Sequence, residues 1–153
     1  MKFVLIVVIV VAFCVIGVLV YSNYLTKKNI YKCMVGFCDY SLLEIKFNKT
    51  NFKSIIEKYL DSSCLEVKNF LNSYLNNSIY NSKALKNEEN ITIQNFLSSI
   101  GKKDVDGEVF NLNKYKEIFK NKLELAKEDE KKRGVASLKI SIILGILVAI
   151  ILI

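Results

Sequence analysis

Residues 104–127 read DVDGEVFNLNKYKEIFKNKLELAK, and residues 128–153 continue as EDEKKRGVASLKISIILGILVAIILI. The first segment repeats apolar side chains every three or four positions, the spacing of one helix face, at Val105, Val109, Leu112, Tyr115, Phe119, Leu123 and Ala126. The second segment begins with charged residues and then becomes almost wholly apolar, and no proline interrupts either. We therefore predict one helix over residues 104–153. Its last 20 or so residues would cover about 30 Å, one hydrocarbon core.

A second apolar segment lies at the N-terminus. Phe3 to Tyr21 contains no charged residue and is long enough to span a bilayer. A cleaved signal peptide is the alternative, because Lys2 precedes the apolar run. The run is longer than a usual signal, however, and no small-x-small cleavage site follows it. We predict a retained membrane helix over residues 1–22.

Basic residues on the flanks of the two apolar segments predict their orientation. Only Lys2 lies on the outer side of the first segment, whereas the inner flanks and the start of the second segment carry Lys27, Lys28, Lys32, Lys127, Lys131, Lys132, Arg133 and Lys139. Positive flanks remain in the cytoplasm. We therefore expect a cytoplasmic domain over residues 23–133, a second membrane helix over 134–153 that continues the last domain helix, and both termini across the membrane.

The net charge of +7 has the same origin. The flanking residues account for most of it, since the rest of the chain carries 14 basic and 12 acidic side chains. No basic patch interleaved with aromatic residues stands out, as a nucleic-acid surface would require. We expect no nucleic-acid partner.

The central residues show helical periodicity and no alternating strand pattern. Beyond the long terminal helix, we predict helices over residues 24–44, 50–59, 64–76 and 87–100, with a break at 47–49. Thr50 is the expected N-cap of the second, and Ser63 with Glu66 fits a capping box for the third. Gly101 stands where the fourth helix should end, and Asp104 can cap the last one. The predicted fold class is all-α, a helical bundle between two membrane helices.

Residues that commonly carry catalysis are scarce. The chain has no histidine, phosphate-binding loop or dinucleotide motif. Three cysteines, Cys33, Cys38 and Cys64, could be imagined as metal ligands, but we interpret them as small apolar residues that stay reduced in the cytoplasm. Acidic residues at 104, 106 and 108 suit the start of a helix. We expect no catalytic, cofactor or metal site and no enzymatic activity.

The segment Phe96-Leu97-Ser98-Ser99-Ile100-Gly101-Lys102-Lys103-Asp104, with the helix and apolar end that follow, resembles the C-terminal half of stage III sporulation protein AB. That family commonly has a Leu-Gly-x-Ser-Asp turn here, in which this chain has Ile100 and Lys103 in place of the leucine and the serine. Residues 40–45 resemble the family's first-helix pattern. The family's Thr-Pro-Leu cap is replaced at residues 49–52. The order of elements matches over nearly the whole chain.

The resemblance implies a domain similar to the cytoplasmic domains of type II secretion F proteins. It also implies a role in the channel that links mother cell and forespore, as a membrane platform component near a cytoplasmic ATPase and ring-forming channel proteins. We therefore expect a non-enzymatic assembly component in the mother-cell membrane, contacting lipid and other stage III proteins, with a homo-oligomer left open. A small membrane-permeabilising protein, holin-like or toxin-like, is the alternative.

One surface stands out as a candidate contact site. Lys131, Lys132 and Arg133, here called the basic collar, directly precede the second membrane segment. They could bind an acidic partner or anionic lipid, or serve only as a topology signal at the headgroup level. Gly101 and Asp104 are expected to have a structural role in the turn between the last two helices.

Overall fold

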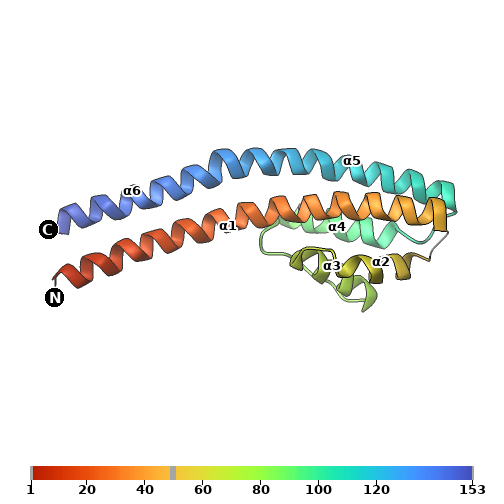
Figure 1. Ribbon diagram of the computed structural model, residues 1–153, viewed down its shortest axis with the longest axis horizontal. Helices are drawn as coiled ribbons and strands as arrows, with labels where there is room; N and C mark the ends of the chain where they lie inside the picture. Colours follow the sequence, from red (N-terminus) through yellow and green to blue (C-terminus); the bar gives the residue numbers. More distant parts are fainter. Residues whose placement is uncertain (1, 49–50, 153) are drawn as a thin grey trace. The chain divides into compact units, whose positions relative to one another are not determined.

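The computed structural model describes residues 2–48 and 51–152 (Figure 1). Helices make up 86% of the structure, and no strand occurs in the described ranges, which confirms the all-α prediction. The elements are α1 (Lys2–Leu43), a π-helix (Glu44–Asn48), α2 (Phe52–Leu60), α3 (Leu65–Leu75), α4 (Asn87–Ser99), α5 (Val105–Asp129), a second π-helix (Glu130–Gly134) and α6 (Val135–Leu152).

The chain divides into two compact units. Residues 29–124 form the first, called the central unit, and residues 1–28 with 125–153 form the second, called the apolar unit. Two helical stretches, Ile6–Asn48 and Val105–Ile151, contain windows that are long and apolar enough to cross a membrane by length and composition. These stretches overlap the two segments, residues 1–22 and 134–153, that were predicted from the sequence as membrane helices.

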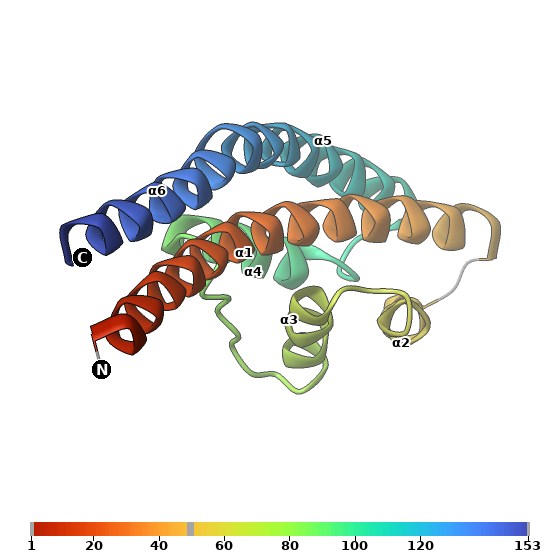
Figure 2. The same ribbon diagram turned by 60° about the vertical axis from the view of Figure 1, so that its left-hand side comes forward.

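Aromatic side chains build the core of the central unit. Phe37 of α1 packs edge-on against Phe96 of α4, with ring centroids 6.1 Å apart, and against Phe52 of α2. Phe96 packs in turn against Phe119 of α5 at 5.2 Å. These rings are almost fully buried. Both ribbon views place α2 and α3 on the other side of α1 from α5 (Figures 1 and 2), so α1 is the central helix of this unit.

The predicted apolar stripe of the last helix supplies part of this core. Leu112 and Phe119 are buried in this core, whereas Val105 at the start of α5 is about half exposed. Ala126 is also buried, but it belongs to the apolar unit. Helical spacing therefore identified the inward face of α5, and the stripe reaches the core only after the first turn.

In the apolar unit, α6 packs against the first part of α1 through glycines. A Cβ atom added at Gly17 would lie 2.9 Å from Ser141 Cβ, and one added at Gly145 would lie 3.3 Å from Phe13 Cβ. Large apolar side chains on both helices, such as Val8 and Ile150, remain exposed. Close approach through small residues with apolar groups facing outward is a common arrangement of membrane helices.

The structure corrects two predicted helix starts. Thr50 lies outside the described residues, and α2 is capped by Asn51, whose side-chain oxygen accepts from Lys53 N at 3.3 Å. The capping box at Ser63 was wrong. Cys64 occupies the N-cap of α3 without a side-chain hydrogen bond, and Ser63 Oγ donates to the Leu60 carbonyl.

Two π-helical turns replace features that the sequence suggested. Helical structure continues through Asn48, where a break over residues 47–49 was predicted; Lys49 lies outside the described residues. The predicted single helix over 104–153 is helical from Val105 to Leu152, but Glu130–Gly134 forms a π-helix. Such turns insert an extra residue and often occur at functional positions.

Candidate functional site

The basic collar lies in the second π-helix, and its three side chains are exposed. Lys132 Nζ lies 3.3 Å from Glu128 Oε2, and Arg133 Nε lies 3.3 Å from Asp129 Oδ1. Ion pairs this exposed contribute little stability. The collar can therefore exchange these partners for an acidic surface or lipid headgroups at low cost.

Glu130, in the same turn, faces the other way. Tyr21 Oη donates to its Oε1 at 2.8 Å, and Lys28 Nζ donates to Oε2 at 3.1 Å. These two hydrogen bonds lower the pKa of the Glu130 carboxyl below its ordinary value. Glu130 thus fixes the collar turn to α1 inside the apolar unit. This role was not predicted from the sequence, in which Glu130 is the last of three consecutive acids before the basic collar.

The turn between α4 and α5 is organised by Glu108. Gly101 has a φ of +76°, in the left-handed region that favours glycine, and so ends α4. The amides of Lys102 and Lys103 both donate to Glu108 Oε1 at 2.9 Å. The Asp104 carbonyl accepts from Glu108 N at 2.9 Å. Glu108 was expected only to suit the helix dipole, but its side chain is the acceptor that holds this turn.

Glu108 is unusually buried for an acid. Only 4% of it is exposed, and Oε2 has no hydrogen-bond partner within the described part of the chain. Next to it in the core, Asn111 donates to Ser99 Oγ at 3.0 Å. A buried carboxylate with charge-assisted bonds to backbone amides fixes a loop firmly. We assign this cluster a structural function.

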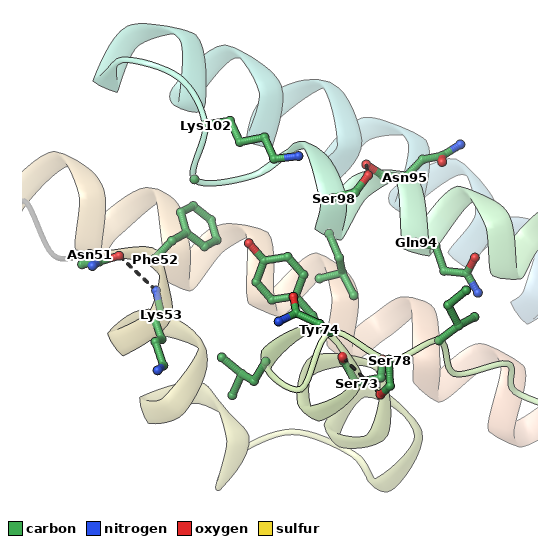
Figure 3. Close-up of a pocket in the computed structure, with 15 residues that line it drawn as sticks. Asn51, Phe52, Lys53, Ser73, Tyr74, Ser78, Gln94, Asn95, Ser98 and Lys102 are labelled. Carbon is green, nitrogen blue, oxygen red and sulfur yellow. Dashed lines mark hydrogen bonds between the residues drawn. The ribbon is translucent and has the colours of Figure 1, made fainter.

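A groove of about 700 Å³ lies between α2, α3 and α4 (Figure 3). Its wall combines amide, hydroxyl and apolar side chains with two lysines, namely Asn51, Phe52, Lys53, Ser73, Tyr74, Leu75, Asn77, Ser78, Ile79, Gln94, Asn95, Leu97, Ser98, Gly101 and Lys102. Figure 3 shows Lys102 extending from the turn toward Ser98. These lining residues include no aspartate or glutamate, so the two lysines are the charged groups of the wall.

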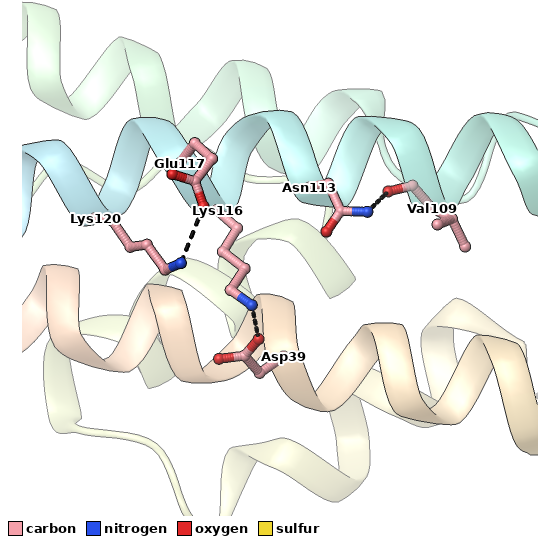
Figure 4. Close-up of polar contacts among 6 residues, drawn as sticks. All are labelled: Asp39, Val109, Asn113, Lys116, Glu117 and Lys120. Atoms are coloured by element: carbon pink, nitrogen blue, oxygen red, sulfur yellow. Dashed lines mark hydrogen bonds and ion pairs between the residues drawn. The ribbon is translucent and has the colours of Figure 1, made fainter.

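The surface where α1 and α5 meet in the central unit carries an ion pair between Asp39 and Lys116 (Figure 4). Hydrogen bonding to Asp39 raises the pKa of Lys116. One turn along α5, Lys120 and Glu117 lie 3.0 Å apart. The Asp39–Lys116 pair joins α1 to α5, whereas the Lys120–Glu117 pair lies within α5 and is more exposed.

The cysteines fall into different environments. Cys38 is fully buried, and burial raises the pKa of its thiol to about 12. Cys33 and Cys64 are only partly buried, and the Cys64 thiol donates to the Asn29 carbonyl on α1 at 3.8 Å, one helical turn before Cys33. No cluster of three or more His, Cys, Asp or Glu side chains suited to a metal occurs among residues 2–48 and 51–152.

Comparison with known proteins identifies a family. The sequence model of the family described as stage III sporulation protein AB matches residues 72–153, slightly more than half of the chain. The matched region contains α4, the Gly101 turn, α5, the basic collar and α6. No curated protein and no solved structure matches this sequence.

Proposed function

The chain belongs to the stage III sporulation protein AB family, and we propose that it is a non-enzymatic platform component of a secretion-like channel between mother cell and forespore. Family membership makes it a sporulation stage III protein. The platform role is our inference. It rests on the order of helices along the chain, in which a helical domain lies between two apolar helices.

The observation that carries the proposal is a helical domain between two apolar helices. The chain enters the central unit through α1 and leaves it through α5, and each helical stretch includes a segment fit to cross a membrane. A protein built this way presents a folded surface beside a bilayer. The positive flanks favour the cytoplasmic side for that surface, in the membrane of the mother cell.

The proposed partners follow from the family and from the exposed surfaces. We propose that the central unit resembles the type II secretion F domain and docks other stage III channel proteins, including a cytoplasmic ATPase. The basic collar would contact lipid headgroups beside this domain. The absence of histidine from the sequence agrees with a binding role, since histidine is the commonest general acid–base catalyst.

The direct test is a pull-down of the full-length chain from membranes of sporulating cells. We expect the wild-type chain to recover other stage III proteins. A triple variant, Lys131→Gln, Lys132→Gln and Arg133→Gln, then distinguishes contact with lipid from contact with protein. If the variant loses bound lipid but still recovers the stage III proteins, the collar contacts lipid headgroups. Recovery of no stage III protein by the wild-type chain would contradict the platform role.

Mechanical coupling between membrane and domain can be tested separately. A Gly-Gly-Ser-Gly insertion between Ala136 and Ser137 should interrupt α6 near its start, because glycine disfavours the helix. We expect a loss of heat-resistant spores. A matched Ala-Ala-Leu-Ala insertion keeps the helix and should preserve more function. Normal sporulation with the glycine insertion would show that rigid coupling is the wrong mechanism.

Membrane permeabilisation remains the alternative, because two apolar helices and a basic collar also occur in lytic proteins. The aromatic core of the central unit favours the platform, since disrupting a bilayer does not require such a core. Expression in a non-sporulating host distinguishes the two. Rapid loss of membrane potential would support permeabilisation, whereas a stable potential would support the platform.

A further inference from the structure

Folding brings together two cysteines that are 31 positions apart in the sequence. Cys33 lies on α1 within the central unit, and Cys64 stands at the N-cap of α3. The sulfur of Cys64 lies 3.8 Å from the carbonyl oxygen of Asn29, one helical turn before Cys33. The thiol of Cys64, at the start of α3, therefore rests on α1 beside the helical turn that carries Cys33.

The surroundings hold this arrangement in place. Tyr59, at the end of α2, donates a hydrogen bond to the Cys33 carbonyl at 2.9 Å. The Ser63 hydroxyl, just before Cys64, donates to the Leu60 carbonyl at 2.9 Å. The turn from α2 to α3 is thus tied both to itself and to α1. These hydrogen bonds hold Cys64 beside the turn of α1 that carries Cys33.

We propose that Cys33 and Cys64 are a reversible dithiol–disulfide site, at which a low-molecular-weight disulfide oxidises the pair and thereby links α1 covalently to the start of α3. This site is independent of the proposed platform role. Cytoplasmic disulfides, where they occur, are commonly transient and redox-sensing.

The reaction proceeds by two thiol–disulfide exchanges. The Cys33 thiolate attacks one sulfur of the small disulfide, forming a mixed disulfide and releasing one small thiolate. Cys64 then loses its proton, attacks the Cys33 sulfur and releases the second small thiolate. Two protein thiols are oxidised, one small disulfide is reduced to two thiols, and the two protons pass to the released thiolates. An added dithiol reductant reverses the process.

The two thiols are unequal in a way that suits these roles. The hydrogen bond from Cys64 lowers the pKa of Cys33 below that of an ordinary thiol, with Lys32 acting in the same direction and burial against it. The pKa of Cys64 is raised, first by its hydrogen bond with Cys33 and then by burial. A partly exposed low-pKa thiol beside a resolving thiol is the arrangement of redox-sensing cysteines. Cys38, fully buried, serves as an internal control.

The test uses the full-length chain in detergent micelles, treated with oxidised glutathione and then denatured and reacted with a maleimide reagent. The untreated chain has four reactive cysteines. After oxidation we expect two, with peptide mass spectrometry identifying the Cys33–Cys64 link. Dithiothreitol should restore four. The oxidised chain should also unfold at a temperature about 5–10 °C higher, because the bond closes a loop that contains α2.

Matched variants separate this site from general oxidation. Cys38→Ser and Cys14→Ser should each retain the link and fall from three reactive thiols to one. Cys33→Ser and Cys64→Ser should form no internal link. Four reactive thiols after treatment, or a link through Cys38, would overturn the proposal. So would a link that forms only once the protein has been denatured, because it would not reflect the folded geometry.

Discussion

At the scale of single residues, Glu108 has the most consequential contacts. One carboxylate oxygen accepts both amides of the turn between α4 and α5, from a position that is almost fully buried. Water cannot reach the buried Glu108 side chain to replace these bonds without opening the turn. The turn that resembles the family pattern is therefore kept in shape by a residue four positions beyond the pattern.

Replacing Glu108 with alanine should lower the free energy of unfolding by about 1–3 kcal/mol, because two partly buried backbone amides lose their acceptor. Glu108→Gln should cost less, since an amide oxygen can still accept. Denaturant titration of the full chain in detergent measures both. Glu117→Ala, an exposed acid on the same helix, is the control and should change stability by roughly 0.5 kcal/mol or less. Equal effects at the two positions would refute the assignment.

Tyr59 offers a test that depends on pH. Burial raises its pKa to about 12, from an ordinary value of 10. The folded state therefore keeps the phenol neutral at a pH where the unfolded chain ionises. The resulting stability is fully present below pH 10 and is lost as pH rises toward 12.

The Tyr59→Phe variant should accordingly be less stable than the wild type near neutral pH, by about 0.5–1.5 kcal/mol for the lost hydrogen bond to Cys33. The difference should shrink as pH rises from 10 to 12, because only the wild type has this phenol. Denaturant midpoints measured for both proteins across that range provide the check. A difference that is constant with pH would mean that burial of the phenol is not its source.

At the scale of elements, sequence periodicity was a good guide. The helix end near Gly101 was predicted correctly, whereas the N-caps of α2 and α3 were not. The presence of a helix and the position of its apolar face both depend on the local spacing of apolar residues. The core positions Leu112 and Phe119 could therefore be predicted. The capping box failed because Glu66 accepts instead from Tyr80, a residue 14 positions away. The groove and the Cys33–Cys64 pair were likewise inaccessible, because they arise only when distant segments meet.

The pairing of α1 with α6 provides an element-scale prediction. Leucine at Gly17 would have to displace Ser141, whose Cβ lies 2.9 Å from the added Cβ position. Overpacking of this kind typically costs about 1–3 kcal/mol. We expect the helices to separate. Electron-resonance distances between spin labels at positions 8 and 150, in a chain without its native cysteines, should broaden.

Val18→Leu is the matched control for this variant. Val18 neighbours Gly17 on the same helix, but 56% of its surface is exposed. Added bulk there should leave the distance distribution unchanged. If both variants broadened the distances, the effect would reflect side-chain volume in the apolar segment and not the glycine contact.

At the scale of the whole molecule, the division into an apolar unit and a central unit explains why charge is concentrated where it is. The basic collar and the other flanking lysines lie next to the two apolar segments predicted as membrane helices. The remaining basic and acidic side chains are nearly equal in number. This distribution predicts sidedness, since basic flanks resist transfer across the membrane. The central unit should then face the cytoplasm.

Sidedness can be measured with one engineered cysteine in a chain whose four native cysteines are replaced. Asp61 is exposed in the turn after α2, so Asp61→Cys should react readily with a soluble maleimide once the cells are opened. We expect no labelling from outside intact cells, because the reagent cannot cross the membrane. Changing Lys131, Lys132 and Arg133 to glutamine should allow partial labelling, since the topology signal is weakened. Full labelling of intact cells carrying the unmodified collar would reverse the assigned orientation and place the docking surface outside.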